Sequence, residues 1–385
     1  MRDTVPLDAI LGAQWGDEGK GRLSVVLSRD ADMCARFQGG PNAGHTTYLL
    51  GRPIELRMLP AGIVSAQLGV IGNGVVVDPA TLLAEVEQLT EWDRNVLSRI
   101  RISRSAHVIT ADAIKLDNQM RAKELGTTGR GVGPTYAAKV ERRGYRIHDL
   151  LEPVIVKRLP LLDREVAIRF SDILGEACVD TSVMMRAALV GGARIVAEGA
   201  QGASLDLDHG DYPYVTASNT TIGSVLTGLG VSHENLREVW LAATAYLTKL
   251  GAGPFPTQVS GAVAEHLVQR GNEYDEDRHE VRRCGWLDLA QLRRAARING
   301  ATGIVLSKLD VLSGLEYVEL HDCDSSSIER FQGWSDDLTG TSHVDDLPVA
   351  AAAYLLAVAE GTQTPILGFC VGPRPEDLVR CSING

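Results

Sequence analysis

Apolar runs and segments of helical periodicity alternate along most of the chain. The runs predict buried strands, and segments with apolar residues at every third or fourth position predict amphipathic helices. Strands are expected at 7–11, 194–202, 240–247, 303–310 and 365–370, and helices at 79–89, 287–297 and 348–360. This alternation is typical of the α/β class, with a large, mostly parallel central sheet and flanking helices. No internal repeat or linker divides the chain, so we expect a single domain over 1–385.

Shorter segments give more local expectations. Residues 69–78 alternate as strand, turn and strand around Gly72 and Gly74, and Asp78 with Pro79 can begin the helix that follows. The glycine-rich stretch 126–146 carries several cations and is expected to be a loop. Residues 272–283 are densely charged and predict a surface loop.

A glycine-rich turn joins the first apolar run to the apolar segment 23–27. It has glycines at 12, 16, 19 and 21 and carries Asp17, Glu18 and Lys20. Strand, glycine loop and helix in this order aim backbone N–H groups and a helix N-terminus at phosphate. The spacing is neither that of a Walker A loop nor that of a dinucleotide fingerprint. A tight turn alone would explain the glycines, but the acid and the lysine inside it favour a phosphate or metal site.

Three further loops carry side chains suited to phosphate and purine chemistry. His45 lies in a glycine loop, where a histidine can donate a proton to developing charge. Thr128 and Arg142 belong to the cationic stretch. Lys308 and Asp310 follow a strand, and the carboxylate can accept two hydrogen bonds from guanine. Each is weak alone: a loop histidine is often merely exposed, and a cationic loop is often merely solvated.

Composition narrows the class of protein. The 385 residues are 44% hydrophobic and 5% aromatic, with a net charge of −11. This balance argues against a nucleic-acid-binding surface. The six cysteines form no CxxC pair, as in a reduced, cytoplasmic protein. The sequence shows no apolar run of 18 residues and no signal peptide, so neither membrane spanning nor secretion is expected.

Eight motifs occur in a defined order: WGDEGKG, GGPNAGHT, GTTGRGVGP with YAAKVERRG, EGAQG, DHGDYPYVTASNTT, GAGPFPT, GNE with GWLD, and KLDVLSG. In this order they resemble the adenylosuccinate synthetases, over about residues 8 to 373. The resemblance implies a P-loop-like GTP-binding ligase that also uses Mg²⁺. In that family GTP phosphorylates O6 of IMP, and the amine of aspartate then displaces the phosphoryl group to give adenylosuccinate, GDP and phosphate.

The resemblance also implies roles for individual residues. Asp17 would take the N1 proton of the purine and ligate Mg²⁺ together with the backbone of Gly44. His45 would protonate or hydrogen-bond the transferring phosphoryl group, and Lys20 would stabilise its charge. Arg142 matches an arginine that reaches the nucleotide of a neighbouring subunit, which implies a homodimer.

The remaining implied positions fall into three groups. Gln201 is expected in the catalytic group. The purine nucleotide and the amino acid are expected to meet Asn42, Ala43, Thr128, Thr216 and Arg278. GTP is expected to meet Gly16, Glu18, Gly19, Gly21, Arg282, Lys308, Asp310, Cys370 and Gly372.

The chain departs from the family pattern in the segment that grips aspartate. Counting without gaps between GNE and GWLD, Glu280 stands where an arginine is expected, whereas Arg282 is kept. An acidic loop is a poor receptor for a dianionic amino acid. Either the loop is rearranged or the amine donor differs from aspartate. The short chain and Pro41 also resemble the archaeal and phage branches of the family.

Two alternatives to the IMP ligase remain. The phage branch includes enzymes that aminate dGMP, but these usually lack the loop aspartate that Asp17 supplies here. A GTP-binding regulatory protein without catalysis is the alternative of another class. Asp17 and His45 together argue against it, because simple binding needs neither.

Overall fold

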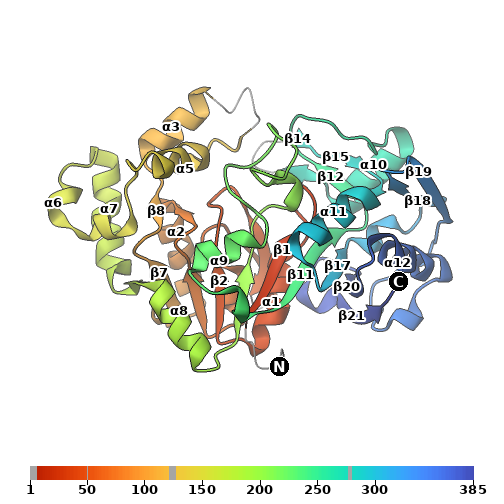
Figure 1. Ribbon diagram of the computed structural model, residues 1–385, viewed down its shortest axis with the longest axis horizontal. Helices are drawn as coiled ribbons and strands as arrows, with labels where there is room; N and C mark the ends of the chain where they lie inside the picture. The colour runs from red at the N-terminus through yellow and green to blue at the C-terminus, as the bar shows by residue number, and fades with distance from the viewer. Residues whose placement is uncertain (1–6, 50, 121–126, 276–279) are drawn as a thin grey trace.

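The structure, a computed structural model, describes residues 7–49, 51–120, 127–275 and 280–385. Its centre is a ten-stranded sheet (Figure 1), in which neighbouring strands are parallel except for β21, which runs antiparallel to β20. In spatial order the strands are β21 (Leu378–Ile383), β20 (Ile366–Cys370), β17 (Gly303–Ser307), β11 (Leu236–Thr244), β1 (Leu7–Gly12), β10 (Ile195–Glu198), β2 (Met33–Arg36), β5 (Leu68–Ile71), β7 (Ile100–Ser103) and β9 (Cys178–Val179). The predicted α/β class with a mostly parallel sheet is confirmed.

Strand β1 lies in the middle of the sheet, between β10 and β11, and all six of its residues are buried. Its side chains alternate between two layers of core. Leu7, Ala9 and Leu11 belong to the core layer that also contains residues of α11 (Leu289–Asn299) and α12 (Val349–Thr362). Ile10 packs on the other face with residues of α1 (Lys20–Leu27). Burial on both faces explains why the run is apolar at every position except Asp8, which pairs with Arg237.

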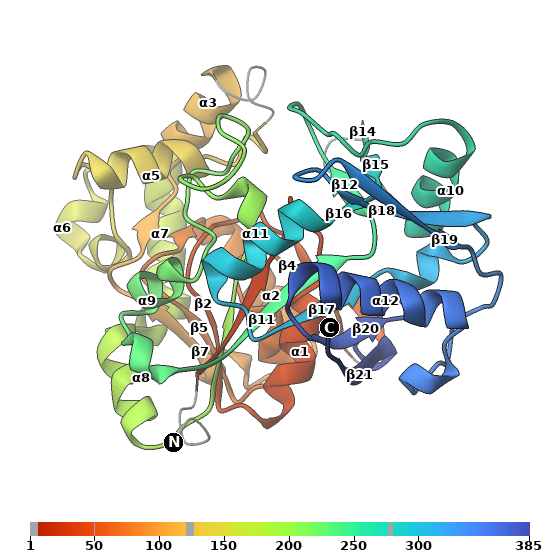
Figure 2. The ribbon, with the colours of Figure 1, turned by 45° about the vertical axis from the view of Figure 1, so that its right-hand side comes forward.

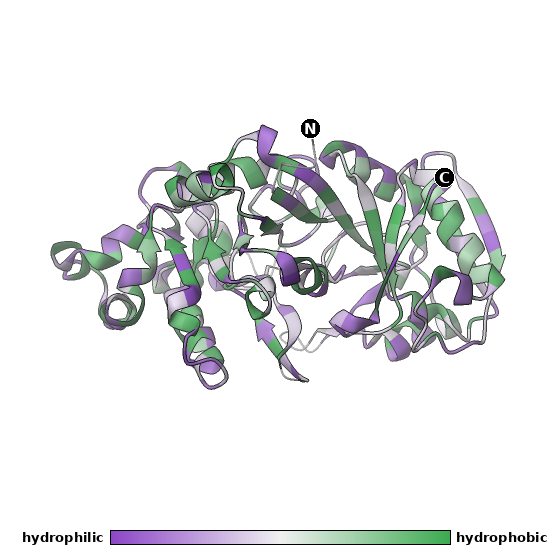
Figure 3. Cartoon of the chain, turned by 90° about the horizontal axis from the view of Figure 1, so that it is seen from below, coloured by the Kyte–Doolittle hydropathy of each residue, from purple (hydrophilic) through white to green (hydrophobic). Residues whose placement is uncertain are grey.

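A second core lies at the edge of the sheet that is formed by β5, β7 and β9. There α2 (Pro79–Thr90) and α7 (Leu161–Leu174) pack against each other and over β5 and β7. Helix α2 begins as predicted, because the Asp78 carboxylate accepts the Ala80 N–H at 3.0 Å. Figure 3 shows mainly apolar central strands, whereas the surrounding helices alternate apolar and polar residues.

The strand, turn and strand predicted over 69–78 are present as β5, a turn at Gly74 and β6 (Val76–Val77). The two strands do not pair with each other, because β6 pairs in parallel with β8 (His107–Val108), and the turn packs on Phe37 and Gly228. One local prediction was wrong. The stretch 126–146 is not all loop, because α5 (Val132–Val140) begins after Gly131, whose φ is 77°. Its proline, Pro134, lies in the first turn, where proline is tolerated.

Smaller elements surround the sheet. A three-stranded sheet of β16 (Leu287–Asp288), β18 (Tyr317–Asp322) and β19 (Ser327–Gln332) lies with α10 (Gly261–Gly271) at one end of the molecule (Figure 2). Helices α3 (Ala111–Met120), α5 and α6 (Pro153–Val156) lie at the other end (Figure 1). Among the described residues, no helix is long and apolar enough to cross a membrane.

The remaining elements are shorter. Helices α8 (Thr181–Val190) and α9 (Gly223–Leu229) contact each other, and β3 (His45–Leu49) pairs with β4 (Arg52–Leu56). Strand β12 (Leu247–Lys249) pairs with β15 (Arg283–Gly285), and β13 (Tyr274–Asp275) with β14 (Glu280–Val281). The single-domain expectation stays a prediction, although one sheet takes strands from both ends of the described chain.

Candidate active site

The loop between β1 and α1 is built around a buried carboxylate. Glu18 accepts the backbone N–H groups of Gln14, at 2.9 Å, and Gly16, at 3.0 Å, and it pairs with the ammonium of Lys20. Positive φ angles at Gly16 and Gly19 let the chain turn around this carboxylate. Glu18 and Lys20, both predicted to serve the nucleotide, therefore also hold the shape of the loop.

Glycines let the loop approach its neighbours closely. A Cβ at Gly12 would overlap the carbonyl oxygen of Gln201, and a Cβ at Gly21 would lie 2.9 Å from Cβ of His45. The loop, the turn after β10 and the start of β3 are therefore in contact. Helix α1 has no side-chain cap at Gly19, so its first turn can offer N–H groups to an anion.

Asp17 points away from this internal network. Its backbone φ is 60°, its side chain is 48% exposed, and Oδ2 lies 3.1 Å from Nε of Arg282. The structure thus brings together two predicted site residues that are 265 positions apart (282 minus 17). A half-exposed carboxylate at the mouth of a phosphate-type loop can accept a proton or ligate a cation.

His45 lies behind the loop and is paired with Glu198. Its Nδ1 is 2.6 Å from Oε1 of Glu198, a carboxylate that also accepts the N–H groups of Ala61, at 3.1 Å, and Gly62, at 3.3 Å. Burial lowers the pKa of His45, although Glu198 opposes the shift. Burial alone would raise the pKa of Glu198, but His45 and Arg36 outweigh it and hold that pKa below its usual range. An ionised Glu198 can only accept a hydrogen bond, so Nδ1 of His45 is the donor in this contact.

Two amide side chains of predicted site residues have unused hydrogen-bonding capacity. Gln201, with φ of 58°, keeps both side-chain amide atoms buried and without a partner in the described part of the chain. Asn42 donates from Nδ2 to Oγ1 of Thr216 at 3.4 Å, and its Oδ1 is likewise unpartnered within that part. Buried polar groups are normally satisfied. These orphan groups fit a site that a polar ligand completes.

The predicted guanine end lies where β17 and β20 stop. Lys308, with φ of 62°, places its ammonium against Glu273, and burial raises the pKa of Asp310. A small cavity between the two strands and α1 is lined by Glu18, Gly19, Arg22, Leu23, Ala242, Val305, Ser307, Cys370 and Leu378. Arg22 donates to the carbonyl oxygen of Gly372, which joins the two predicted halves of the GTP site.

Not all predicted residues gather here. Thr128 is exposed, and Arg142 is exposed just after the end of α5, with φ of 62°. Ala43 and Gly44 lie in the loop before β3, and Gly44 packs closely on Glu55. Arg278 lies outside the described residues.

The oxygen atoms of the candidate site fit a Mg²⁺ ion that is also bound by substrate phosphates. Magnesium prefers oxygen ligands and is usually held by one or two carboxylates together with substrate phosphates. Asp17 supplies an accessible carboxylate, and Gly44 a backbone carbonyl. Among the described residues, no cluster of three or more His, Cys, Asp or Glu side chains forms a metal site of its own.

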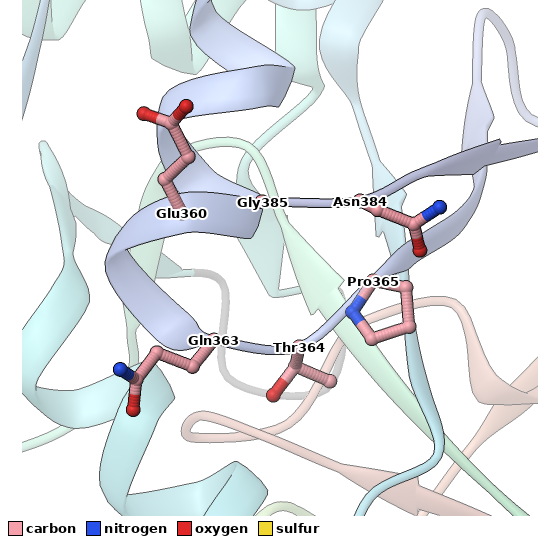
Figure 4. A pocket seen from close by; sticks show the side chains of 6 residues that line it. All are labelled: Glu360, Gln363, Thr364, Pro365, Asn384 and Gly385. Carbon is pink, nitrogen blue, oxygen red and sulfur yellow. The ribbon is translucent and has the colours of Figure 1, made fainter.

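A separate surface pocket lies elsewhere in the described part of the chain. A pocket of about 360 Å³ is lined by Glu360, Gln363, Thr364, Pro365, Asn384 and Gly385, at the end of α12 (Figure 4). None of these residues was predicted to act in the site. The pocket contains one carboxylate and no cationic side chain among these lining residues, so it is poorly suited to a phosphate.

Sequence reasoning missed three residues of the site. Glu198 ends a buried strand within the EGAQG motif, Glu273 belongs to the GNE motif, and Arg36 is fully buried beside Glu198. For Glu198 and Arg36 the available signal was a charged residue at the end of an otherwise apolar run, whereas Glu273 follows no such run. Such a residue is rarely buried without a partner.

These features define an α/β fold whose candidate site lies at the carboxyl ends of parallel strands, at the loop that follows the central strand. A family model described as adenylosuccinate synthetase matches residues 9–165 and 164–379. The chain belongs to the adenylosuccinate synthetase family. It is therefore a ligase of the class that forms carbon–nitrogen bonds.

Individual relatives are similar over nearly their whole length. The adenylosuccinate synthetases of Xanthomonas oryzae and Thermus thermophilus are each 39% identical, and the alignments cover 94% and 97% of this chain and 96% and 98% of theirs. The solved, fully ligated adenylosuccinate synthetase of Plasmodium falciparum superposes with a TM-score of 0.90 at 33% identity, covering 98% of this chain and all of the other.

A phage protein is similar in fold. The succinoaminodeoxyadenylate synthetase of cyanophage S-2L, in a structure bound to dGMP and dATP as an energy donor, has a TM-score of 0.70. The alignment covers 97% of this chain and 95% of that one, at 22% identity. This likeness shows a shared fold alone.

Proposed function

We propose that this ligase joins IMP and L-aspartate at the expense of GTP, with Mg²⁺, and releases adenylosuccinate, GDP and phosphate. The observation that carries the proposal is the close approach of three segments at the end of β1: the glycine loop that holds Asp17, the start of β3 with His45 and its partner Glu198, and the turn that holds Gln201. The side-chain amide of Gln201 is buried and has no partner among the described residues. The relatives named adenylosuccinate synthetase support the same substrates.

In the first step a phosphoryl group moves to the purine. The Asp17 carboxylate takes the N1 proton, and O6 becomes a nucleophile. A bond forms between O6 and the γ-phosphorus, the bond from that phosphorus to the bridging oxygen breaks, and GDP leaves with the electron pair. Bound Mg²⁺ would neutralise charge on the phosphates, held by Asp17 and the carbonyl of Gly44.

His45 and Gln201 act around the transferred group. Because Nδ1 of His45 is committed to Glu198, Nε2 is the ring atom available to the phosphoryl oxygens. A proton on Nε2 creates an imidazolium that Glu198 stabilises. The Gln201 amide can offer both a donor and an acceptor to the purine.

In the second step the amine of aspartate attacks C6. The carbon–nitrogen bond forms, the bond from C6 to O6 breaks, and phosphate leaves with the electron pair while the amine loses a proton. The first step makes O6 a better leaving group, which is the reason for spending GTP. Lys308, Asp310, Cys370 and Gly372 are assigned to GTP, and exposed Arg142 to a second subunit of a homodimer.

The test is a product analysis. The purified protein is incubated with GTP, MgCl₂, IMP and aspartate, and products are identified by mass spectrometry. Adenylosuccinate and GDP are expected in equal amounts, with no product after chelation by EDTA. Asp17→Ala should give none while binding GTP within about threefold of wild type, since the change affects the chemical step.

Parallel reactions separate the rival substrates. One set replaces IMP by GMP or dGMP, another replaces aspartate by a panel of amino acids, and a third replaces GTP by ATP. Greater turnover of dGMP than of IMP would overturn the acceptor, and greater turnover of another amine would overturn aspartate. Failure of every combination to release GDP would overturn the ligase itself.

A further inference from the structure

Glu273 is a fully buried carboxylate between α10 and β13. Its Oε1 accepts the hydroxyl of Tyr246 and meets the ammonium of Lys308, and its Oε2 lies 3.5 Å from Nη1 of Arg282. Its main-chain carbonyl also accepts the N–H of Arg282 at 2.9 Å. Three segments distant in sequence therefore converge on one side chain.

A buried charge is costly unless it is paired and hydrogen-bonded. Glu85 shows how a carboxylate with a local structural role is satisfied here: it accepts the backbone N–H groups of Arg57, Met58 and Leu59. Glu273 is different because its side-chain partners are two cations and a phenol. Burial raises the pKa of the Tyr246 phenol, and the charge of Glu273 raises it further, so the phenol keeps its proton and acts as a donor.

The contacts of Glu273 continue to the catalytic loop. Arg282 lies between two carboxylates, with Nη1 toward Glu273 and Nε 3.1 Å from Oδ2 of Asp17. The result is a row of alternating charges: Lys308, Glu273, Arg282 and Asp17. One end is the lysine assigned to GTP, and the other is the carboxylate assigned to the chemical step.

The backbone leaves room for this arrangement. A Cβ at Gly271 would collide with the hydroxyl of Tyr246 and would lie 2.8 Å from Oε1 of Glu273. The side chains of Lys308 and Arg282 are 20% and 17% exposed, so they can reach a ligand, whereas that of Glu273 is fully enclosed. Glu273 can therefore act on substrates only through its partners.

We propose that Glu273 is a positioning residue that ties the GTP end of the site to the catalytic carboxylate, through Lys308 on one side and Arg282 on the other. It keeps the two cations near each other despite their repulsion. Without the charge of Glu273, Lys308 loses the anion that orients it. The contact of Arg282 with Asp17 is then no longer balanced by a contact with Glu273. GTP binding and the placement of Asp17 are then disturbed together. This inference rests on the proposed function, because the roles of both ends come from it.

The principal test is Glu273→Gln, which keeps the shape and removes the charge. We expect the KM for GTP to rise about tenfold and kcat to fall about tenfold, while the KM for IMP stays within about threefold, since displacement of catalytic groups by about 1 Å can have effects of this order. A merely structural role would lower the amount of active enzyme and leave every KM in place. Unchanged GTP parameters in the folded variant would overturn the inference.

The matched control is Glu319→Gln. Glu319 is also a carboxylate that joins two side chains, Arg330 and His321, but it lies on β18 in the outer sheet. Its substitution removes a charge of the same kind and should leave the kinetic constants within about twofold, as expected for a partly exposed ion pair. A matching rise in the KM for GTP would show that the Glu273 result is not specific.

Single and paired changes give a second test should Glu273→Gln not fold. Lys308→Met and Arg282→Met are made singly and together, and the dissociation constant for GDP is measured by calorimetry. If Glu273 couples the two cations, their effects on the binding free energy are non-additive. Additive effects would overturn the inference. Because this readout needs no turnover, it stays informative if the wild type proves inactive with IMP and aspartate, a result that would count against the proposed function instead.

Discussion

His45 and Glu198 act as one unit because they are buried together and joined by a hydrogen bond. The chain separates them by 153 positions, and the sheet brings them within 2.6 Å. The histidine could be selected from the sequence because it lies in a glycine loop. Its partner could not, because Glu198 is identified by what it contacts, and that contact exists only after β10 has paired with β2.

Glu198→Gln tests this pair at the residue scale. The amide can still accept the Nδ1 proton, but it cannot stabilise an imidazolium, so kcat should fall by roughly 10²-fold, as for loss of acid–base assistance. The KM for IMP and GTP should change little. With the amide oxygen facing His45 and Ala61, the backbone N–H of Gly62 would face the amide nitrogen, at a cost of about 1–3 kcal/mol. Steady-state kinetics and thermal unfolding measure the two effects, and an unchanged kcat would contradict the assigned role.

At the scale of elements, strands were easier to predict than their partners. The buried runs at 7–11, 303–310 and 365–370 became β1, β17 and β20, because burial on both faces leaves a continuous apolar pattern. The strand, turn and strand at 69–78 were predicted, but local alternation does not reveal that β6 pairs with β8. The glycines around Arg130 concealed α5, because a glycine with positive φ can precede a helix as well as break one.

The strand pair of β13 and β14 contains Glu280, the residue at which the chain departs from the family pattern. Asp275 and Glu280 stand opposite each other in its register. Glu280 is an exposed acid on β14, and a negative charge there repels a dianionic amino acid. The assignment of Glu280 to an arginine position comes from counting along the sequence. Its effect on the KM for aspartate can be measured.

Glu280→Arg should lower the KM for aspartate by about tenfold, because it replaces a repulsive charge by one able to form a bidentate pair with a carboxylate. The control is Val281→Arg, which adds an arginine at the next, also exposed, position. Side chains of adjacent strand residues point to opposite faces, so this change should leave the KM unaltered. Equal effects from both variants would indicate a general electrostatic attraction, and no effect from either would mean that the hairpin does not meet the amine donor.

At the scale of the whole molecule, the open question is whether a second subunit completes the site. Arg142 is exposed at the end of α5, and the sequence resemblance assigns it to the neighbouring subunit's nucleotide. Nothing in a single chain could reveal this from periodicity or composition, because both describe how the chain buries its own residues.

Mixing two defective variants tests a shared site. Asp17→Ala and Arg142→Ala should each be nearly inactive, whereas co-expression should restore about a quarter of wild-type activity, because half of the dimers would be mixed and each would hold one intact site, as an isologous pair requires. Sedimentation of the wild type gives the oligomeric state independently. A dimer whose mixed form stays inactive would place Arg142 in its own subunit's site.

The Glu18–Lys20 pair has a consequence for selectivity. Because the lysine already faces a carboxylate inside the loop, the loop resembles an inner salt more than an open positive charge. An inorganic anion should bind weakly there, because it must compete with the Glu18 carboxylate for the ammonium of Lys20. Selectivity for the nucleotide then depends on contacts with the parts of it that lie far from the phosphate. The phosphate released at the end of each cycle should bind weakly to the loop and dissociate readily.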